Sequence, residues 1–179
     1  MRFPMETERL ILRPFEVADT EAAFGWLGDP VVMRFTPSGP DASTEQTEAR
    51  LANYREHQIA HGFSKWMILD RRSKLPIGDS GLLLIKEHGW IDLGFRLAQQ
   101  YWGKGLATEA ALAWVRAAYG ELHLERLKAM VHPEYVVSIR VLTKLRFRED
   151  RRDNILGMNS ILFSLDTDAF TQAGASRQR

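Results

Sequence analysis

Two glycines separated by one residue stand where a predicted strand ends and a predicted helix begins, in the run Gln100-Tyr-Trp-Gly-Lys-Gly-Leu-Ala107. A junction of this kind presents unpaired backbone N–H groups and the positive end of the helix dipole. Glycine lets the backbone approach an anion closely, and Lys104 adds a cation. The pattern therefore predicts a pyrophosphate site centred on Gly103, Lys104 and Gly105.

Two better-known phosphate loops do not match this run. A Walker A loop needs four residues between its glycines and a Ser or Thr after the Lys, whereas here Gly105 is followed by Leu106. The Rossmann fingerprint needs a third glycine, and Thr108 stands in its place. Two glycines alone are typical of a simple tight turn. Their position between a strand and a helix, with the spacing Gln-x-x-Gly-x-Gly, favours the anion site.

Changes in the spacing of apolar residues predict the strands and helices that position this turn. Alternating apolar residues predict an early strand, then three antiparallel strands in quick succession, and two later strands. Helical spacing predicts two helices after the first strand, one after the glycine turn and a short one before the last strand. The order predicts a mixed α/β (α+β) sheet with helices on both faces, in which the strand, turn, helix and strand from Ile91 to Val131 form a right-handed parallel crossover. The expected strands are Leu10–Arg13, Trp66–Leu69, Ile77–Ile85, Ile91–Leu97, Leu127–Val131 and Ser160–Leu165, and Asp19 and the pair Ser43 and Gln46 are the expected helix N-caps.

Composition narrows the class of protein. The 179 residues suit one domain, here 1–170, followed by a polar segment 171–179 that we expect to be a flexible tail. The formal net charge of +1 gives no overall field that favours nucleic acid or a membrane as partner. The chain has no cysteine, which excludes disulfides, thiolate metal ligands and a Cys nucleophile, and we expect no metal site. Neither a signal-peptide core nor a membrane-spanning run is present, so the expected location is the cytoplasm.

The glycine turn resembles the acetyl-CoA-binding motif of the GNAT acetyltransferases. The longer run Tyr101 to Ala110 is similar to one branch, which acetylates the N-termini of ribosomal proteins. The resemblance extends from about Thr7 to Leu165. Further matches are Thr7 to Arg13, Asp29-Pro30 followed by Val32-Met33, and Ser138 to Val141 followed by Lys144-Leu145 and Phe147.

The resemblance implies the GNAT fold, with about six to seven strands in its central sheet, and direct transfer of an acetyl group from acetyl-CoA to a primary amine in a ternary complex. It implies a protein N-terminal amine as acceptor and, on resemblance alone, a homodimer. Two alternatives stay open. The acceptor could be a small molecule such as a polyamine, antibiotic or amino acid, or the chain could be a CoA-binding regulator without turnover.

The family pattern also implies where acetyl-CoA binds. Backbone N–H groups of the turn would hold the pyrophosphate, and the preceding strand would pair with the pantetheine arm at the point where two strands splay apart. Two positions depart from the pattern: Tyr135 replaces the usual Asn, and Arg146 replaces a Gly, where a left-handed conformation is costly. The implied binding residues are Phe95, Arg96, Leu97, Gln100, Gly103, Lys104, Gly105, Leu106, Ala107, Tyr135 and Ser138.

Attack of an amine on a thioester needs a neutral amine and a proton for the departing thiolate. Asp92, on the strand entering the turn, is the first candidate base, although a carboxylate paired with a nearby cation is an equal interpretation. Glu87 and Asp79 are weaker candidates because carboxylates beside turns are usually solvated, and His132 suits a structural role at least as well.

For the thiolate, Ser138 is the first candidate donor and Tyr135 the alternative, since Leu142 occupies the position where the family usually has Tyr. Arg151 and Arg152 could meet the cofactor's 3′-phosphate, although a solvated loop is the more ordinary interpretation.

Overall fold

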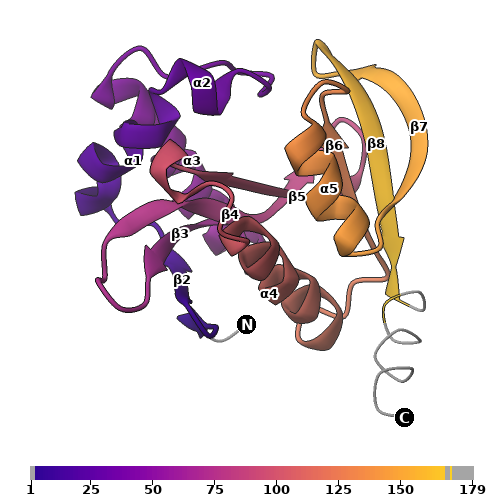
Figure 1. Ribbon diagram of the computed structural model, residues 1–179, viewed down its shortest axis with the longest axis horizontal. Coiled ribbons are helices and arrows are strands. Elements are labelled where there is room, and N and C mark those ends of the chain that lie inside the picture. Colours follow the sequence, from indigo (N-terminus) through magenta and orange to yellow (C-terminus); the bar gives the residue numbers. More distant parts are fainter. Residues whose placement is uncertain (1–2, 168–169, 171–179) are drawn as a thin grey trace.

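A single eight-stranded sheet forms the centre of the molecule in a computed structural model that describes residues 3–167 and 170 (Figure 1). The strand order is β1-β2-β3-β4-β5-β6-β8-β7. The predicted tail 171–179 lies outside the described residues. The strands are β1 (Met5–Glu6), β2 (Leu10–Pro14), β3 (Lys65–Asp70), β4 (Pro76–Ile85), β5 (Trp90–Leu97), β6 (Arg126–Val131), β7 (Arg148–Ile155) and β8 (Met158–Asp166).

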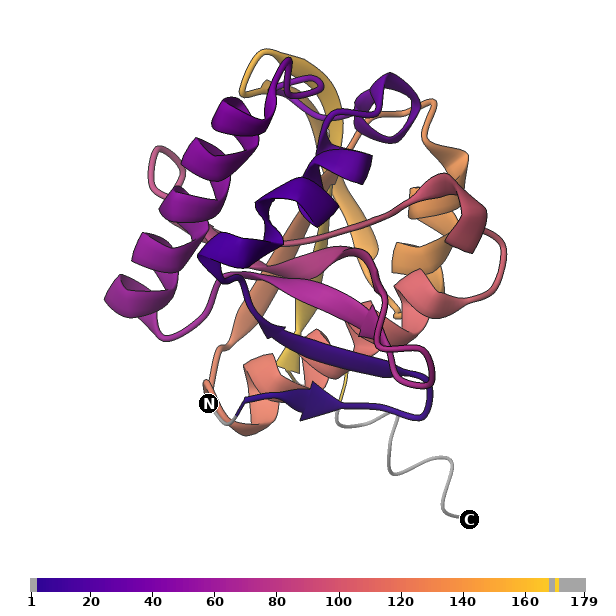
Figure 2. The ribbon, with the colours of Figure 1, turned by 90° about the vertical axis from the view of Figure 1, so that its left-hand side faces the viewer.

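All six strands expected from the sequence are present, and the mixed α/β fold is confirmed. Two further strands bring the sheet to eight rather than six or seven. β1 has only two residues and pairs with β2 at one edge of the sheet (Figure 2). β7 is exposed at every residue except Ile155, so it lacks the apolar alternation that marks a strand in a sequence.

Helices cover both faces of the sheet, as expected. Alternate residues of the strands, such as Leu93 and Leu97 of β5, pack in a core with Trp114 of α4 and Leu142 of α5. A second core on the opposite face joins α1 and α2 to Leu51 of α3. In Figure 1, α1, α2 and α3 gather over the N-terminal half of the sheet, and α5 lies beside β6. The α-helices are α1 (Thr20–Leu27), α2 (Pro30–Met33), α3 (Thr44–His61), α4 (Leu106–Gly120) and α5 (Val136–Lys144), and two 3₁₀ turns span Val17–Asp19 (η1) and Gln99–Tyr101 (η2). No helix among the described residues is long and apolar enough to cross a membrane.

The sheet splits between β5 and β6, the parallel pair that α4 connects. The pairing register between them holds one residue pair, Asp92 with Lys128. β5 continues to Leu97 and β6 to Val131 without pairing to each other, although β5 stays paired with β4 and β6 with β8. The split was expected from the family resemblance, and it leaves one side of the β5 backbone without a strand partner.

Three local predictions come out differently in detail. Asp19 and Ser43 do occupy the N-cap positions of α1 and α3, but neither side chain caps its helix. The Asp19 carboxylate instead accepts hydrogen bonds from the Arg13 guanidinium at 2.7 Å and from the backbone N–H of Glu16 at 2.7 Å, so it is not available to the amides of α1. Gln46 accepts from the N–H of Ala42. Arg146 adopts the left-handed conformation that its family position requires, with φ 69°, despite the cost for a residue with a Cβ.

His57 connects α3 to the sheet where β4 extends beyond the end of β3. Its Nδ1 lies 2.8 Å from the carbonyl oxygen of Phe63, and its Nε2 lies 3.0 Å from the backbone nitrogen of Leu84. The Leu84 N–H can donate only to an unprotonated Nε2, so Nδ1 carries the proton and the ring is neutral. Burial lowers the pKa of His57 below its ordinary value, which also favours the neutral ring.

We expect His57→Ala to lower the free energy of unfolding at pH 7.5 by about 1–3 kcal/mol, because Leu84 loses its acceptor in a half-buried place. The folded-state pKa is lowered, so this stabilisation is complete above the unfolded pKa, about 6.5, and is lost as the pH falls below it. Urea titrations from pH 5 to pH 8 should show a shallower acid-side decline for the variant than for the parent. His88→Ala, at an exposed ring, is the control. Equal pH profiles for His57→Ala and the parent would contradict this role.

Candidate functional site

The glycine turn connects β5 to α4 through η2, with backbone angles that only glycine adopts without strain. Gly103 has φ 72° and Gly105, the N-cap of α4, has φ 76°. A Cβ built at Gly103 would meet nothing within 4 Å, so open space lies beside the turn. The indole Nε1 of Trp102 donates to the carbonyl of Leu97 at 2.7 Å and ties the turn to the strand before it. The N-terminus of a fifteen-residue helix thus faces free space, as an anion site requires.

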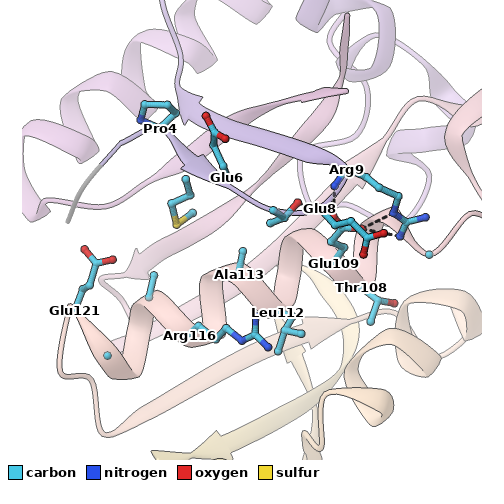
Figure 3. Close-up of a pocket in the computed structure, with 15 residues that line it drawn as sticks. Pro4, Glu6, Glu8, Arg9, Thr108, Glu109, Leu112, Ala113, Arg116 and Glu121 are labelled. Atoms are coloured by element: carbon cyan, nitrogen blue, oxygen red, sulfur yellow. Dashed lines mark hydrogen bonds and ion pairs between the residues drawn. The ribbon is translucent and has the colours of Figure 1, made fainter. Parts of the chain in front are cut away.

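A charged clamp holds the turn from behind. Arg9, immediately before β2, donates from Nε to Glu109 of α4 at 2.6 Å, and its NH1 donates to the backbone carbonyl of Lys104 at 2.9 Å. Glu109 also accepts from the backbone N–H of Arg9 and from the hydroxyl of Thr7. Figure 3 shows Arg9 and Glu109 in direct contact. Both line a groove of about 920 Å³ between the first two strands and α4. This clamp fixes the orientation of the Lys104 carbonyl.

Two cavities meet at the split between β5 and β6. The first, which we call the turn cavity, measures about 270 Å³ and is bounded by the glycine turn, the end of β5 and α5. The second, the inner cavity, measures about 290 Å³ and lies against α3 and the faces of β3 to β6. Phe95, Arg96, Tyr135 and Ser138 line both, so the two cavities adjoin at these residues.

Most of the residues that the sequence analysis assigned to acetyl-CoA lie around the turn cavity. Gln100 and Lys104 are the exceptions: neither lines it. Gln100 is exposed on η2, and the Lys104 ammonium lies 5.4 Å from the centre of the Tyr101 ring. The predicted residues that do line the cavity are Phe95, Arg96, Leu97, Gly103, Gly105, Leu106, Ala107, Tyr135 and Ser138.

Arg140 and Lys144 also line the turn cavity, although neither was expected there from the sequence. They lie one turn apart on α5, and both are exposed. Arg151 and Arg152, the earlier candidates for a phosphate contact, lie on β7 and line neither cavity. They pair instead with Asp153 and Glu149. The spacing of two cations at i and i+4 after a predicted strand was the signal available in the sequence.

Asp92 is buried in the inner cavity, with 6% of its surface exposed. Its Oδ1 accepts the backbone N–H of Met130 at 2.9 Å, directly beyond the last paired residues of β5 and β6. Burial raises the pKa of Asp92 to about 6, against the opposing effects of the Lys65 charge and the Met130 N–H. The carboxyl therefore changes protonation state close to neutral pH.

Lys65 of β3 is the nearest cationic partner of Asp92, and it is also 6% exposed. Its side chain crosses two glycines at matching register positions, Gly81 of β4 and Gly94 of β5. The ammonium donates to the Gly81 carbonyl at 3.2 Å, and a Cβ at Gly94 would lie 2.1 Å from it. Burial lowers the pKa of Lys65 to about 8. Only glycine at position 94 leaves room for this cation beside Asp92.

The weaker base candidates are placed differently. Asp79 is fully buried rather than solvated: its carboxylate accepts from the Trp26 indole at 2.7 Å and from the Arg96 guanidinium at 2.7 Å, which leaves it no free role. Glu87 lies exposed in the β4–β5 turn. His132 stacks on Phe35 and accepts the N–H of Glu134 on Nδ1, and it lines neither cavity.

Ser138 and Tyr135 stand at the junction of the cavities. Among the described residues, neither hydroxyl has a hydrogen-bond partner, so both are available to a ligand. Burial raises the pKa of the Tyr135 hydroxyl, which keeps it protonated. Leu142, where the family usually has Tyr, is buried and lines the inner cavity.

Comparison with known proteins agrees with this geometry. The family model described as "Acetyltransferase (GNAT) domain" matches residues 9–148. An uncharacterized N-acetyltransferase of Bacillus subtilis, YoaA, is 30% identical over 151 residues, which is 83% of this chain and 85% of that protein. A second relative, the uncharacterized N-acetyltransferase p20 of Bacillus licheniformis, is 28% identical over 145 residues, 80% of this chain and 82% of its own.

Solved structures share the fold. A GNAT-family acetyltransferase of Bacillus anthracis superposes with a TM-score of 0.80 at 22% identity, covering 92% of this chain and 98% of that one. A ribosomal-protein-S5-alanine acetyltransferase of Vibrio fischeri superposes with a TM-score of 0.75 at 20% identity, covering 93% and 97%. With the family model spanning most of the sequence and the turn in place, the chain belongs to the GNAT acetyltransferase family and is an N-acetyltransferase.

Proposed function

We propose that this enzyme transfers an acetyl group from acetyl-CoA to a protein N-terminal amine. The observation that carries the proposal is the continuous path from the glycine turn, along the unpaired side of β5, to the buried Asp92. Acetyl transfer from CoA to an amine requires a phosphate site at one end of this path. At the other end it is helped by a carboxylate whose pKa lies close to neutral pH.

The turn cavity suits the pyrophosphate and the pantetheine arm. Backbone N–H groups from Gly103 to Ala107 would hold the pyrophosphate, and the open space beside Gly103 admits it. Peptide groups of Phe95 to Leu97 lack a β6 partner and would pair with the amides of the arm. Arg140 and Lys144 add two cations on the facing helix. Acetyl-CoA supplies the activated acetyl carbonyl and the thiolate leaving group.

The inner cavity suits the amine. An N-terminal amine has an ordinary pKa near 8, so a part of it is neutral at pH 7 and a carboxylate base of modest strength suffices. As the amine nitrogen bonds to the acetyl carbon and the carbon–sulfur bond breaks, Asp92 would take the amine proton. Ser138, at the junction of the cavities, would donate a hydrogen bond to the departing sulfur.

Thiol release from acetyl-CoA in the presence of N-terminal peptides and small-molecule amines tests the function directly. We expect turnover with peptides, and we expect Ser138→Ala to lower kcat by about ten- to a hundredfold with unchanged affinity for CoA, because the lost hydrogen bond forms mainly in the transition state. Tyr135→Phe is the matched control, since Tyr135 lines the same junction. A larger loss in Tyr135→Phe than in Ser138→Ala would transfer the role to Tyr135. Binding of CoA without thiol release for every amine would contradict the proposed function.

The clamp behind the turn predicts that Arg9→Ala weakens CoA binding about tenfold, as expected for one charge-assisted hydrogen bond that orients the turn. Acetyl-pantetheine lacks the pyrophosphate, so its KM should be unchanged in this variant. Gly103→Val, which adds a side chain at φ 72° on the open side, should abolish CoA binding.

Arg71→Ala is the control for this clamp, because Arg71 bonds the Thr7 carbonyl and Glu6 on the same segment but not the turn. Isothermal titration with CoA and steady-state kinetics with acetyl-pantetheine provide the two measurements. Equal losses for both acyl donors in Arg9→Ala would show a general fold defect instead of a positioned turn.

The pKa of Asp92 predicts the pH dependence of kcat/KM for the amine. The rate should rise as Asp92 loses its proton near pH 6, and again as the amine becomes neutral near pH 8. Asp92→Asn should remove the lower limb and reduce the plateau about a hundredfold, while its amide oxygen still accepts the Met130 N–H. Lys65→Met removes the cation that lowers the Asp92 pKa and should move that limb to higher pH.

Asp150→Asn is the control for Asp92, because Asp150 pairs with Lys128 on the neighbouring strand and lines neither cavity. Its pH profile should match that of the parent. A lower limb that persists in Asp92→Asn would exclude Asp92 as the base.

A further inference from the structure

The side of the inner cavity formed by α3 and β3 presents hydrogen-bond donors. Arg50 and Tyr54 lie four residues apart, on one face of α3, and Lys65 lies opposite on β3. We call these three residues the donor wall. Ser38, which also lines the cavity, accepts from NH1 of Arg50 at 3.1 Å and so keeps its own hydroxyl proton for another partner.

The carboxylates that balance the cations here are withdrawn from the cavity. Asp41 accepts from Nε and NH2 of Arg50 and from the hydroxyl of Thr47, and it does not line the cavity. Asp79, equally absent from the lining, is occupied by Arg96 and Trp26. Asp41 and Asp79 balance the charges of Arg50 and Arg96, but of these four side chains only the two guanidinium groups line the cavity.

Tyr54 belongs to the donor wall because its hydroxyl oxygen already accepts a hydrogen bond, which leaves its proton to be donated. The Arg96 guanidinium donates to the Tyr54 hydroxyl oxygen at 2.9 Å. No acceptor for the Tyr54 proton lies within hydrogen-bond distance among residues 3–167 and 170, and the Lys65 ammonium has one such acceptor, the Gly81 carbonyl. Donors on both elements therefore remain free for a ligand in the cavity.

Asp92 is the one carboxylate that lines the inner cavity in the described chain, and it already interacts with Lys65 and the Met130 N–H. A substrate with a second ammonium group would place that charge beside Arg50 and Lys65 with no carboxylate besides Asp92 to pair it, which is costly away from water. A substrate carboxylate would meet several free donors, two of them charged.

We propose that the amine accepted by this enzyme carries a carboxylate close to its amino group, which the donor wall binds, and no second ammonium group. The inference rests on the proposed function and narrows its acceptor. The same chemistry has two sources: an acidic residue at the first or second position of a peptide, and a free amino acid, whose own carboxylate lies beside its amine. Polyamines and polycationic antibiotics lie outside this class.

Matched acceptors provide the test. The peptides Asp-Ala-Ala and Asn-Ala-Ala, and Ser-Asp-Ala and Ser-Asn-Ala, differ only in charge, and aspartate and spermidine represent the free amino acid and the polyamine. We expect the KM of each acidic peptide to be about tenfold lower than that of its amide counterpart, with spermidine the poorest acceptor. Turnover of aspartate at the level of the acidic peptides would assign the site to a free amino acid. Turnover of the peptides alone would assign it to an N-terminus.

Variants connect the preference to the donor wall. Arg50→Met with Asp41→Asn removes the ion pair without leaving a buried charge, and Asp41→Asn alone is its reference. We expect the double variant and Tyr54→Phe to raise the KM of the acidic peptides about tenfold, and to leave the KM of the amide peptides and of acetyl-CoA unchanged. Arg55→Met is the control on the same helix, because Arg55 pairs with Glu48 and does not line the cavity.

The outcomes separate this inference from the proposed function. Thiol release with equal KM values for acidic and amide peptides, or a preference for spermidine, would overturn the donor wall and leave the acetyltransferase activity standing. Absence of thiol release with every amine in the panel would overturn the proposed function and the inference with it. A loss of the charge preference in Arg55→Met as large as in the double variant would also overturn the assignment to Arg50.

Discussion

One hydrogen bond, from the Met130 N–H to the Asp92 carboxylate, is what the split sheet depends on. Two parallel strands that diverge after a single residue pair leave backbone donors without partners, and a buried unpaired N–H costs about 1–3 kcal/mol. Asp92 satisfies that donor with a side chain. The same carboxylate therefore bridges the two strands beyond their last paired residues and stands at the edge of the space that the divergence creates. Its structural role and its proposed role as a base use different oxygens of one group.

The cations around this carboxylate depend on small residues elsewhere in the sheet. Lys65 reaches Asp92 only because Gly81 and Gly94 lie at matching positions on the next two strands. Arg96 shares the same face through its pair with Asp79. Buried ion pairs of this kind add little net stability, since desolvation offsets the attraction. Their value in this enzyme is that they place donors and an acceptor at fixed points around a cavity.

The sequence predicted the features that depend on neighbouring residues. The two glycines at 103 and 105, the strand before them and the helix after them are all local patterns, and the structure confirms these elements. The sequence did not predict the contacts between residues that lie far apart along the chain. Nothing near Lys65 indicates that it lies beside Asp92, and Arg9 meets Glu109 across 100 residues of sequence. The cap at Asp19 failed for a related reason: the Asp19 carboxylate pairs with Arg13 and with the N–H of Glu16, and the N-cap motif of α1 includes neither.

The two outer strands have a consequence for how this protein meets others. At one edge β1 is two residues long, and at the other β7 carries the exposed run Arg148-Glu-Asp-Arg-Arg-Asp153. A short edge and a highly charged edge are both poor templates for another chain's strand. The sheet is therefore protected against open-ended aggregation by backbone pairing. Association with another molecule through these strands would have to rely on side chains.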